Sequence, residues 1–132
     1  MISKPSCLLI FGILLCVLHL SACQNWNAFR RKHVAQRVNC NSAMNRSPFR
    51  PLVSCKQLNT FIHASASTVK NICQGVIQST NTTSRVSFRY TNCIFTSRRR
   101  RQCRYRAATG NNVICVTCER GAPVHFVRVG RC

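Results

Sequence analysis

Cysteine content constrains this chain more than any other feature. The sequence has 132 residues and 11 cysteines. Three of these fall within residues 1–23, and an even set of eight follows: Cys40, Cys55, Cys73, Cys93, Cys103, Cys115, Cys118 and Cys132. A dense, even set is typical of small extracellular domains, in which disulfides supplement a modest hydrophobic core. We therefore expect four disulfides, although the sequence alone leaves 105 connectivities open.

Residues 1–23 predict a secretory signal peptide. A lysine precedes an apolar run over 7–20, and small residues occupy the −3 and −1 positions before Gln24. The run is too short to span a bilayer comfortably and matches a signal sequence. Its end also fits a bacterial lipoprotein box, in which Cys23 would carry a lipid. Cleavage after Cys23 would leave one domain, 24–132, outside the cell.

The chain is extremely basic. It has 20 Lys and Arg residues against one acid, Glu119, and a formal net charge of +19. Most of the cations are arginines, which bind phosphate in a bidentate manner and stack on bases. The charge predicts attraction to RNA, glycosaminoglycans or anionic membranes. The alternative is a solvated cationic surface that serves only solubility.

Periodicity and turn residues predict an α+β domain. Helices are expected over 26–34, 41–46 and 65–75, with a loop over 47–54. Strands are expected over 56–63, 85–92, 102–109, 112–118 and 123–129, with a turn at 109–112. The expected architecture is three short helices on a twisted antiparallel sheet, held by four disulfides.

Several motifs have more than one interpretation. Arg98–Arg101 predicts an exposed loop that serves nuclear import, proprotein processing, polyanion binding or solvation. Asn45-Arg46-Ser47 and Asn81-Thr82-Thr83 are glycosylation sequons, and Pro48 makes the first the poorer acceptor. Cys115-Val116-Thr117-Cys118 fits a zinc half-site or a redox pair. No second CxxC motif follows and secreted thiols oxidise, so we expect no metal.

Two histidines and one lysine suggest a chemistry. His33 and His125 could exchange protons with a ribose 2′-hydroxyl and a departing 5′-oxygen, while Lys56 stabilises charge on phosphorus. Their spacing alone does not exclude unrelated residues of a basic domain. The positive surroundings should lower the imidazole pKa values and favour an acidic pH optimum. For His63 a structural role is the default.

The segment Cys55-Lys56-Gln57-Leu58-Asn59-Thr60-Phe61 resembles the CKxxNTF signature of the pancreatic ribonuclease superfamily. Both ends resemble the amphibian, onconase-like branch: Gln24-Asn25-Trp26 with Phe29, Lys32 and His33, and Cys115-Val116-Thr117-Cys118-Glu119 with Pro123-Val124-His125-Phe126 and Cys132. The resemblance covers essentially all of 24–132. It implies an RNase A-like fold and a secreted, metal-free endoribonuclease without cofactors. Such an enzyme cleaves 3′ of pyrimidines through a 2′,3′-cyclic phosphate, with a cytotoxic or host-defence role.

The resemblance also implies individual roles. His33 would be the general base, His125 the general acid and Lys56 the stabiliser of the transition state. Substrate binding would fall to Gln24, Lys32, Thr60, Thr117, Glu119 and Phe126. Gln24 would cyclise to pyroglutamate and pack near Lys32, Thr60 would read a pyrimidine, and the backbone around Phe126 would complete the phosphate pocket. Glu119, after Thr117, would bind guanine 3′ of the cleaved bond, with a chance surface glutamate as the alternative.

Family pairing of the cysteines implies Cys40–Cys93, Cys55–Cys103, Cys73–Cys118 and Cys115–Cys132. The chain departs from the family pattern in its loop 41–54, which is longer than in the shortest amphibian relatives, and in its run of four arginines. No acid follows His125, so the mammalian-type aspartate that orients the imidazole has no match. A backbone carbonyl would have to replace it.

Two other functions compete with the nuclease. One is a cationic antimicrobial protein that disrupts anionic membranes with little need for catalysis. The other is a lectin-like or glycosaminoglycan-binding protein. The joint presence of His33, Lys56 and His125 favours the nuclease, and the charge favours membrane binding as an added activity. Expected partners are RNA and anionic cell surfaces or glycosaminoglycans, and a monomer is expected.

Overall fold

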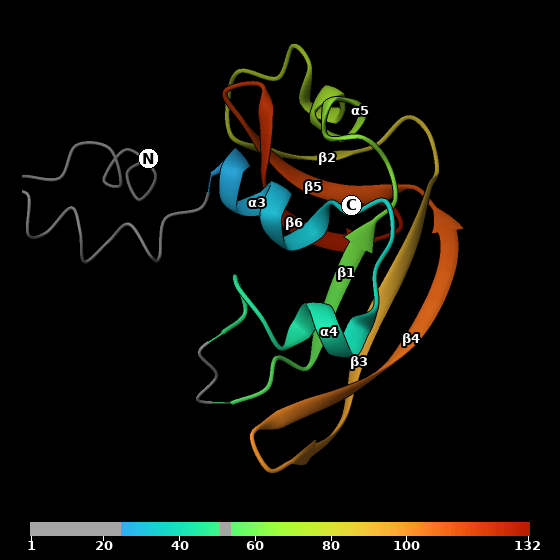
Figure 1. The fold of residues 1–132 in the computed structure, drawn as a ribbon. Coiled ribbons are helices and arrows are strands. Elements are labelled where there is room, and N and C mark those ends of the chain that lie inside the picture. Colours follow the sequence, from blue (N-terminus) through green and yellow to red (C-terminus); the bar gives the residue numbers. More distant parts are fainter. Residues whose placement is uncertain (1–24, 51–53) are drawn as a thin grey trace, which may run out of the picture.

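The computed structural model describes residues 25–50 and 54–132 (Figure 1). The predicted signal peptide and Gln24 lie outside the described residues. The elements in chain order are α3 (Trp26–His33), α4 (Cys40–Met44), β1 (Leu58–Ile62), α5 (Ala66–Lys70), the 3₁₀ turn η1 (Asn71–Cys73), β2 (Thr80–Thr83), β3 (Phe88–Arg99), β4 (Gln102–Asn112), β5 (Ile114–Glu119) and β6 (Ala122–Val129).

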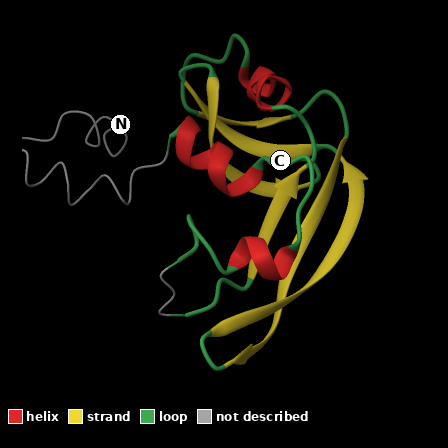
Figure 2. Cartoon of the chain, viewed as in Figure 1, coloured by secondary structure: helices red, strands yellow, loops and turns green. Residues whose placement is uncertain are grey.

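The strands form two antiparallel sheets, where the sequence predicted one. Their orders are β1-β3-β4 and β2-β5-β6. Helix α3 contacts β1 of the first sheet and β6 of the second, so it lies where the two sheets meet. Helix α4 packs on the first sheet, and α5 lies at the end of the second (Figure 2). The α+β class and the three predicted helices are confirmed.

The described residues form two buried cores, and the first is shared by both sheets because it contains Ile62 of β1 and Ile114 of β5. The first core lies under α3 and α5 and centres on Phe29, Ile62, Val69, Ile114 and Val116. The second lies under α4 and centres on Met44, Phe61 and Tyr105 with four half-cystines. Thr91 and Cys93 on β3, and Cys103 and Tyr105 on β4, are buried and alternate with more exposed residues, so one face of this part of the hairpin is turned toward the core.

All four predicted disulfides are present. Cys40–Cys93 and Cys55–Cys103 cross the core under α4, and Cys73–Cys118 joins η1 to β5. Cys115–Cys132 ties the last residue of the chain to β5. Cys115 and Cys118 therefore belong to different bridges, and the CxxC motif is not a redox pair.

The predicted turn at 109–112 is wrong. Gly110 and Asn111 continue β4, where they pair with Tyr90 and Arg89. Gly110 is needed for packing, because a Cβ atom there would collide with the phenol ring of Tyr90. The chain changes direction at Val113 instead, whose N–H donates to the Asn112 side chain.

The run Arg98–Arg101 is exposed, as predicted, but only two of its residues form the turn and the other two belong to a strand. Arg98 and Arg99 end β3, and a two-residue turn over 100–101 leads into β4. The run is the tip of a hairpin that points away from the rest of the chain, at the bottom of Figure 1. Strand β3 is therefore longer than predicted. Strand β2, an edge strand rich in threonine, was not predicted.

Within residues 25–50 and 54–132, no helix is long and apolar enough to cross a membrane.

Candidate active site

A cleft with a volume of about 530 Å³ opens between α3, β1 and β6. It brings together most of the predicted site residues, which lie far apart in the sequence. The lining residues are Lys32, His33, Lys56, Leu58, Asn59, Thr60, Asn92, His125, Phe126, Val127, Arg128 and Val129. Both histidines, the signature lysine and three of the predicted binding residues therefore share one cavity.

His33 is the last residue of α3 and is held by a backbone carbonyl. Asn25 caps the helix start by accepting from the Ala28 N–H, and the buried helix face carries Phe29 and His33 one turn apart. The His33 Nδ1 donates to the Thr60 carbonyl oxygen at 2.8 Å. Because a carbonyl can only accept, the proton of a neutral His33 lies on Nδ1, and Nε2 keeps its lone pair.

Aromatic packing buries the His33 ring. Its centroid lies 5.1 Å from that of Phe29 and 5.2 Å from that of Phe126. Burial lowers the pKa of His33 from its ordinary 6.5 to about 4, against the opposing effect of the Thr60 hydrogen bond. The charges of Lys56, Lys32 and His125 lower it further. The sequence predicted the direction but credited the positive surroundings, which are the smaller cause.

Lys56 is held by Asn59, a residue to which the sequence analysis gave no role. The Lys56 ammonium donates to Asn59 Oδ1 at 2.8 Å, and Asn59 Nδ2 donates to the Lys32 carbonyl oxygen at 2.8 Å. The buried amide thus joins the lysine to the end of α3. Partial burial of the ammonium lowers the pKa of Lys56, and Lys32 adds to this effect. Asn59 belongs to the CKxxNTF signature, so the signal was present in the sequence.

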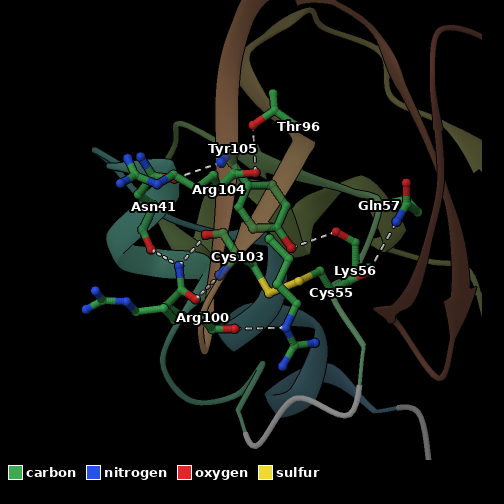
Figure 3. Close-up of a disulfide and its surroundings, with 11 residues drawn as sticks. Asn41, Cys55, Lys56, Gln57, Thr96, Arg100, Cys103, Arg104 and Tyr105 are labelled. Carbon is green, nitrogen blue, oxygen red and sulfur yellow. Dashed lines mark hydrogen bonds between the residues drawn. A yellow bond between two sulfur atoms is a disulfide. The ribbon is translucent and has the colours of Figure 1, made fainter.

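The backbone of Lys56 is fixed from the other side by Tyr105. The Tyr105 hydroxyl donates to the Lys56 carbonyl oxygen at 2.6 Å, beside the Cys55–Cys103 disulfide (Figure 3). Strand β4 is therefore cross-linked to the Cys55-Lys56 segment both covalently and by a hydrogen bond. Nothing in the sequence around Tyr105 pointed to this contact.

Thr60 lies on the cleft side of β1 and bonds to a neighbouring strand. Its hydroxyl donates to Asn92 Oδ1 at 2.6 Å, across the β1–β3 register that pairs the two residues. Asn92 was not among the site residues predicted from the sequence. The amide orients the Thr60 hydroxyl inside the cleft, in a position suited to contact a base edge.

His125 and Phe126 reach the cleft on strand β6. A tight turn at Arg120 and Gly121, both with positive φ, joins β5 to β6. Such a two-residue turn requires left-handed backbone at both positions, which glycine accepts readily. The register then places His125 opposite Thr117 on β5.

Two predicted binding residues, Thr117 and Glu119, are not among the residues that line the cleft. Thr117 lies on β5 beside His125, and its hydroxyl donates to Asn81 Oδ1 at 2.8 Å. Glu119 ends the same strand, opposite Ala122. Gln24 lies outside the described residues. Their roles stay predictions.

The third histidine outside the predicted signal has a structural setting, as expected. His63 Nδ1 donates to the Ala35 carbonyl oxygen at 2.6 Å, and Nε2 lies 2.7 Å from the Thr91 hydroxyl. It joins the segment after α3 to the first sheet. In the described part of the chain, no group of three His, Cys, Asp or Glu side chains is placed to hold a metal ion.

Comparison with known proteins decides the family. Residues 24–127 match pancreatic ribonuclease. The chain belongs to the pancreatic ribonuclease family. It is 46% identical over 129 residues to the oocytes ribonuclease of Aquarana catesbeiana, with 96% of each chain covered.

Solved structures agree with this assignment. Amphinase, a cytotoxic ribonuclease from Rana pipiens oocytes, superimposes with a TM-score of 0.73 at 37% identity, covering 81% of this chain and 98% of that one. Cytotoxic ribonucleases from Rana catesbeiana, complexed with d(ApCpGpA) and 2′,5′-CpG, give a TM-score of 0.70 at 34% identity, with coverage of 83% and 99%. The predicted amphibian likeness is confirmed.

The site geometry predicts how His33 titrates. An NMR titration of its C2 proton should show a midpoint near 4, well below 6.5. As the predicted general base, His33 would act when neutral, so the acidic limb of kcat/KM should fall only as the pH drops through that low value.

Two variants separate the causes of this low pKa. Phe126→Ala exposes the ring and should raise the midpoint more than Lys32→Gln, which removes one nearby charge, because burial is the larger effect. A larger rise in Lys32→Gln would assign the shift to charge instead.

Proposed function

We propose that this pancreatic-type ribonuclease cleaves RNA 3′ of pyrimidines, without a metal, through a 2′,3′-cyclic phosphate. The convergence of His33, Lys56 and His125 on one cleft carries the proposal. These residues come from α3, the segment before β1, and β6, and a basic domain without this function has no reason to gather them.

The proposed chemistry follows from the protonation states. His33 Nε2 takes the proton of the ribose 2′-hydroxyl, and the 2′-oxygen attacks phosphorus. The bond to the 5′-oxygen breaks as His125 gives that oxygen a proton. Lys56 offsets the charge that builds on the phosphoryl oxygens. Water then opens the cyclic phosphate with the two imidazoles in exchanged roles. Thr60 is the proposed pyrimidine reader, and Lys32 and the Phe126 backbone the proposed phosphate contacts.

The first test is RNA cleavage in EDTA by wild type and by His33→Ala, Lys56→Ala and His125→Ala. Each variant should lose activity by orders of magnitude, since all three groups act on one transition state. Lys70→Ala is the matched control, because it removes the same charge from a lysine that packs on Trp26 and does not line the cleft. Wild-type rates in any of the three site variants would refute the assignment.

We further propose that the protein is secreted after removal of residues 1–23, with Gln24 cyclised to pyroglutamate. Four disulfides support this, because such bridges form and persist in oxidising compartments. A host-defence role is supported by the similarity to cytotoxic ribonucleases.

A preference for guanine after the cleaved pyrimidine is proposed for Glu119. This residue is two positions along β5 from Thr117, which pairs with the proposed general acid His125. We therefore expect its carboxylate to meet the nucleotide that leaves with the 5′-oxygen. A carboxylate suits guanine, whose N1–H and N2–H are adjacent donors. The complexes of the Rana catesbeiana ribonucleases hold d(ApCpGpA) and 2′,5′-CpG, in which guanine follows cytosine.

Cleavage of UpG against UpA at moderate salt tests this role. Wild type should prefer UpG by about tenfold, since a charge-assisted pair contributes roughly 1–3 kcal/mol. Glu119→Gln should lose most of that ratio. An unchanged ratio in the variant would reduce Glu119 to a surface residue.

A second activity, binding of polyanions, is favoured by the hairpin tip. Strand β1 pairs with β3 only as far as Ile94, whereas β3 and β4 pair on to Arg99. From Thr96 onward the hairpin extends roughly 14 Å without a neighbouring strand, at the rise of an antiparallel strand. All four side chains of Arg98–Arg101 are exposed there and none lines the cleft. The tip therefore fits RNA beyond the cleaved bond, glycosaminoglycans or anionic surfaces.

Replacement of Arg98–Arg101 by serine should flatten the dependence of RNA or heparin binding on salt, because fewer counterions are released. Cleavage of a dinucleotide should barely change, since it is too short to reach the tip. Loss of dinucleotide cleavage with an unchanged salt slope would place the tip in the active site.

A further inference from the structure

We propose that the secreted protein carries an N-linked oligosaccharide on Asn81 and none on Asn45, and that this sugar stands at the leaving-nucleotide side of the cleft. The inference rests on the proposed secretion. Both residues head sequons of the form Asn-X-Ser/Thr. The contacts of the two amides differ, and this difference selects between them.

The Asn45 side chain is fully used inside the fold. Its Nδ2 donates to the carbonyl oxygens of Asn41, at 2.6 Å, and Cys103, at 2.7 Å. Its Oδ1 accepts from the Cys103 N–H at 2.9 Å. A glycosylated amide has one N–H left, so at least one of these bonds must break, and the sugar would have to fit between α4 and β4.

Loss of an Asn45 hydrogen bond would destabilise the surrounding structure. Its neighbour Asn41 accepts from the Tyr105 N–H at 2.7 Å, and Tyr105 holds the Lys56 backbone. Figure 3 shows Asn41, Cys103 and Tyr105 side by side next to the Cys55–Cys103 bridge. A sugar on Asn45 would therefore disturb the support of the catalytic lysine. Chains modified there would fail to reach this fold.

Asn81 has the opposite setting. It is exposed on β2, the edge strand of its sheet, and its Oδ1 accepts from the Thr117 hydroxyl. Within the described residues no hydrogen bond uses its Nδ2. Attachment of a sugar to Nδ2 leaves Oδ1 free to keep the bond to Thr117, so the folded state tolerates the modification.

The register places this sugar near the reaction. Asn81 pairs with Thr117, and Thr117 pairs with His125, so the three residues form one row across β2, β5 and β6. Paired residues in antiparallel strands project from the same side of the sheet. With strands about 4.8 Å apart, the Cα atom of Asn81 lies roughly 10 Å from that of His125. Because His125 is the proposed acid for the 5′-oxygen, the sugar would flank the path of the RNA that follows the cleaved bond.

The transfer itself uses a lipid-linked oligosaccharide in the secretory pathway. Nδ2 of Asn81 forms a bond to C1 of the first sugar and gives up one proton. The bond between that sugar and the lipid diphosphate breaks, and the lipid diphosphate leaves. No oxidant or reductant takes part.

Occupancy is tested by secretion of the full chain from mammalian cells that make only high-mannose sugars. Intact mass should show one oligosaccharide, and peptide mapping should place it on Asn81. Asn81→Gln should remove the added mass. Ser47→Ala, which destroys the other sequon but keeps the Asn45 amide, should retain it. Sugar on Asn45 of the folded protein, or unmodified Asn81, would overturn the proposal.

A second arm separates this proposal from the proposed secretion. Residues 1–23 are replaced by an established secretion signal of another protein. Sugar on Asn81 in that chain but not in the original one would refute only the role of residues 1–23. Asn81 left bare in both would refute the site itself, and the mass readout does not depend on ribonuclease activity.

The position beside the cleft is tested with endoglycosidase H, which trims the chain to one sugar and leaves charge unchanged. Trimming should raise kcat/KM for long RNA severalfold and leave cleavage of a dinucleotide nearly unchanged, because only the polymer passes Asn81. Equal rates on long RNA before and after trimming would place the sugar away from the substrate path.

Discussion

The hydrogen bond from His33 Nδ1 to the Thr60 carbonyl oxygen is the contact on which the site depends. It joins α3 to β1 at the junction of the two sheets, and it leaves the lone pair of Nε2 available. Because the donor is an imidazole and the acceptor is a main-chain carbonyl, the bond fixes both the position and the tautomer of the His33 ring. The buried amide of Asn59 reinforces the same junction by joining Lys32 to Lys56.

The fold has to tolerate a formal charge of +19 with a single acid. Ion pairs therefore contribute little, and self-repulsion opposes compact structure. Four disulfides limit the entropy of the unfolded chain, and three of them pass through the two cores. Two disulfides also hold segments that line the cleft, since Cys55 precedes Lys56 and Cys115–Cys132 ties the chain after β6 to β5.

Two groups of cationic side chains lie far apart, one in the cleft and one at the far end of the β3–β4 hairpin. Lys32, Lys56 and Arg128 line the cleft, where cations favour a phosphate, and the charges of Lys56 and Lys32 add to the burial that lowers the pKa of His33. The arginines at the tip of the β3–β4 hairpin lie beyond the last pairing with β1. This separation makes it reasonable for one small domain to combine a ribonuclease site with a polyanion-binding arm.

The sequence by itself indicated the family, the three helices and the three candidate catalytic residues, and the family resemblance, not the cysteine spacing, supplied the disulfide pairing. The sequence could do so because the CKxxNTF signature, the capped helices and the cysteines are local patterns. It failed at Gly110, where a residue typical of turns serves the packing of Tyr90, and at β2, whose exposed polar residues form a strand only because β5 is there to pair with them.

Only the tertiary structure decided which side chains support the site and which sequon is available. Asn92 and Tyr105 act through contacts with residues 32 and 49 positions away, and no spacing in the sequence reports such contacts. In the sequence the two sequons are distinguished by Pro48, which makes the first the poorer acceptor. The fold separates them because it buries the hydrogen-bonding capacity of Asn45 between α4 and β4 and leaves Nδ2 of Asn81 on an open edge.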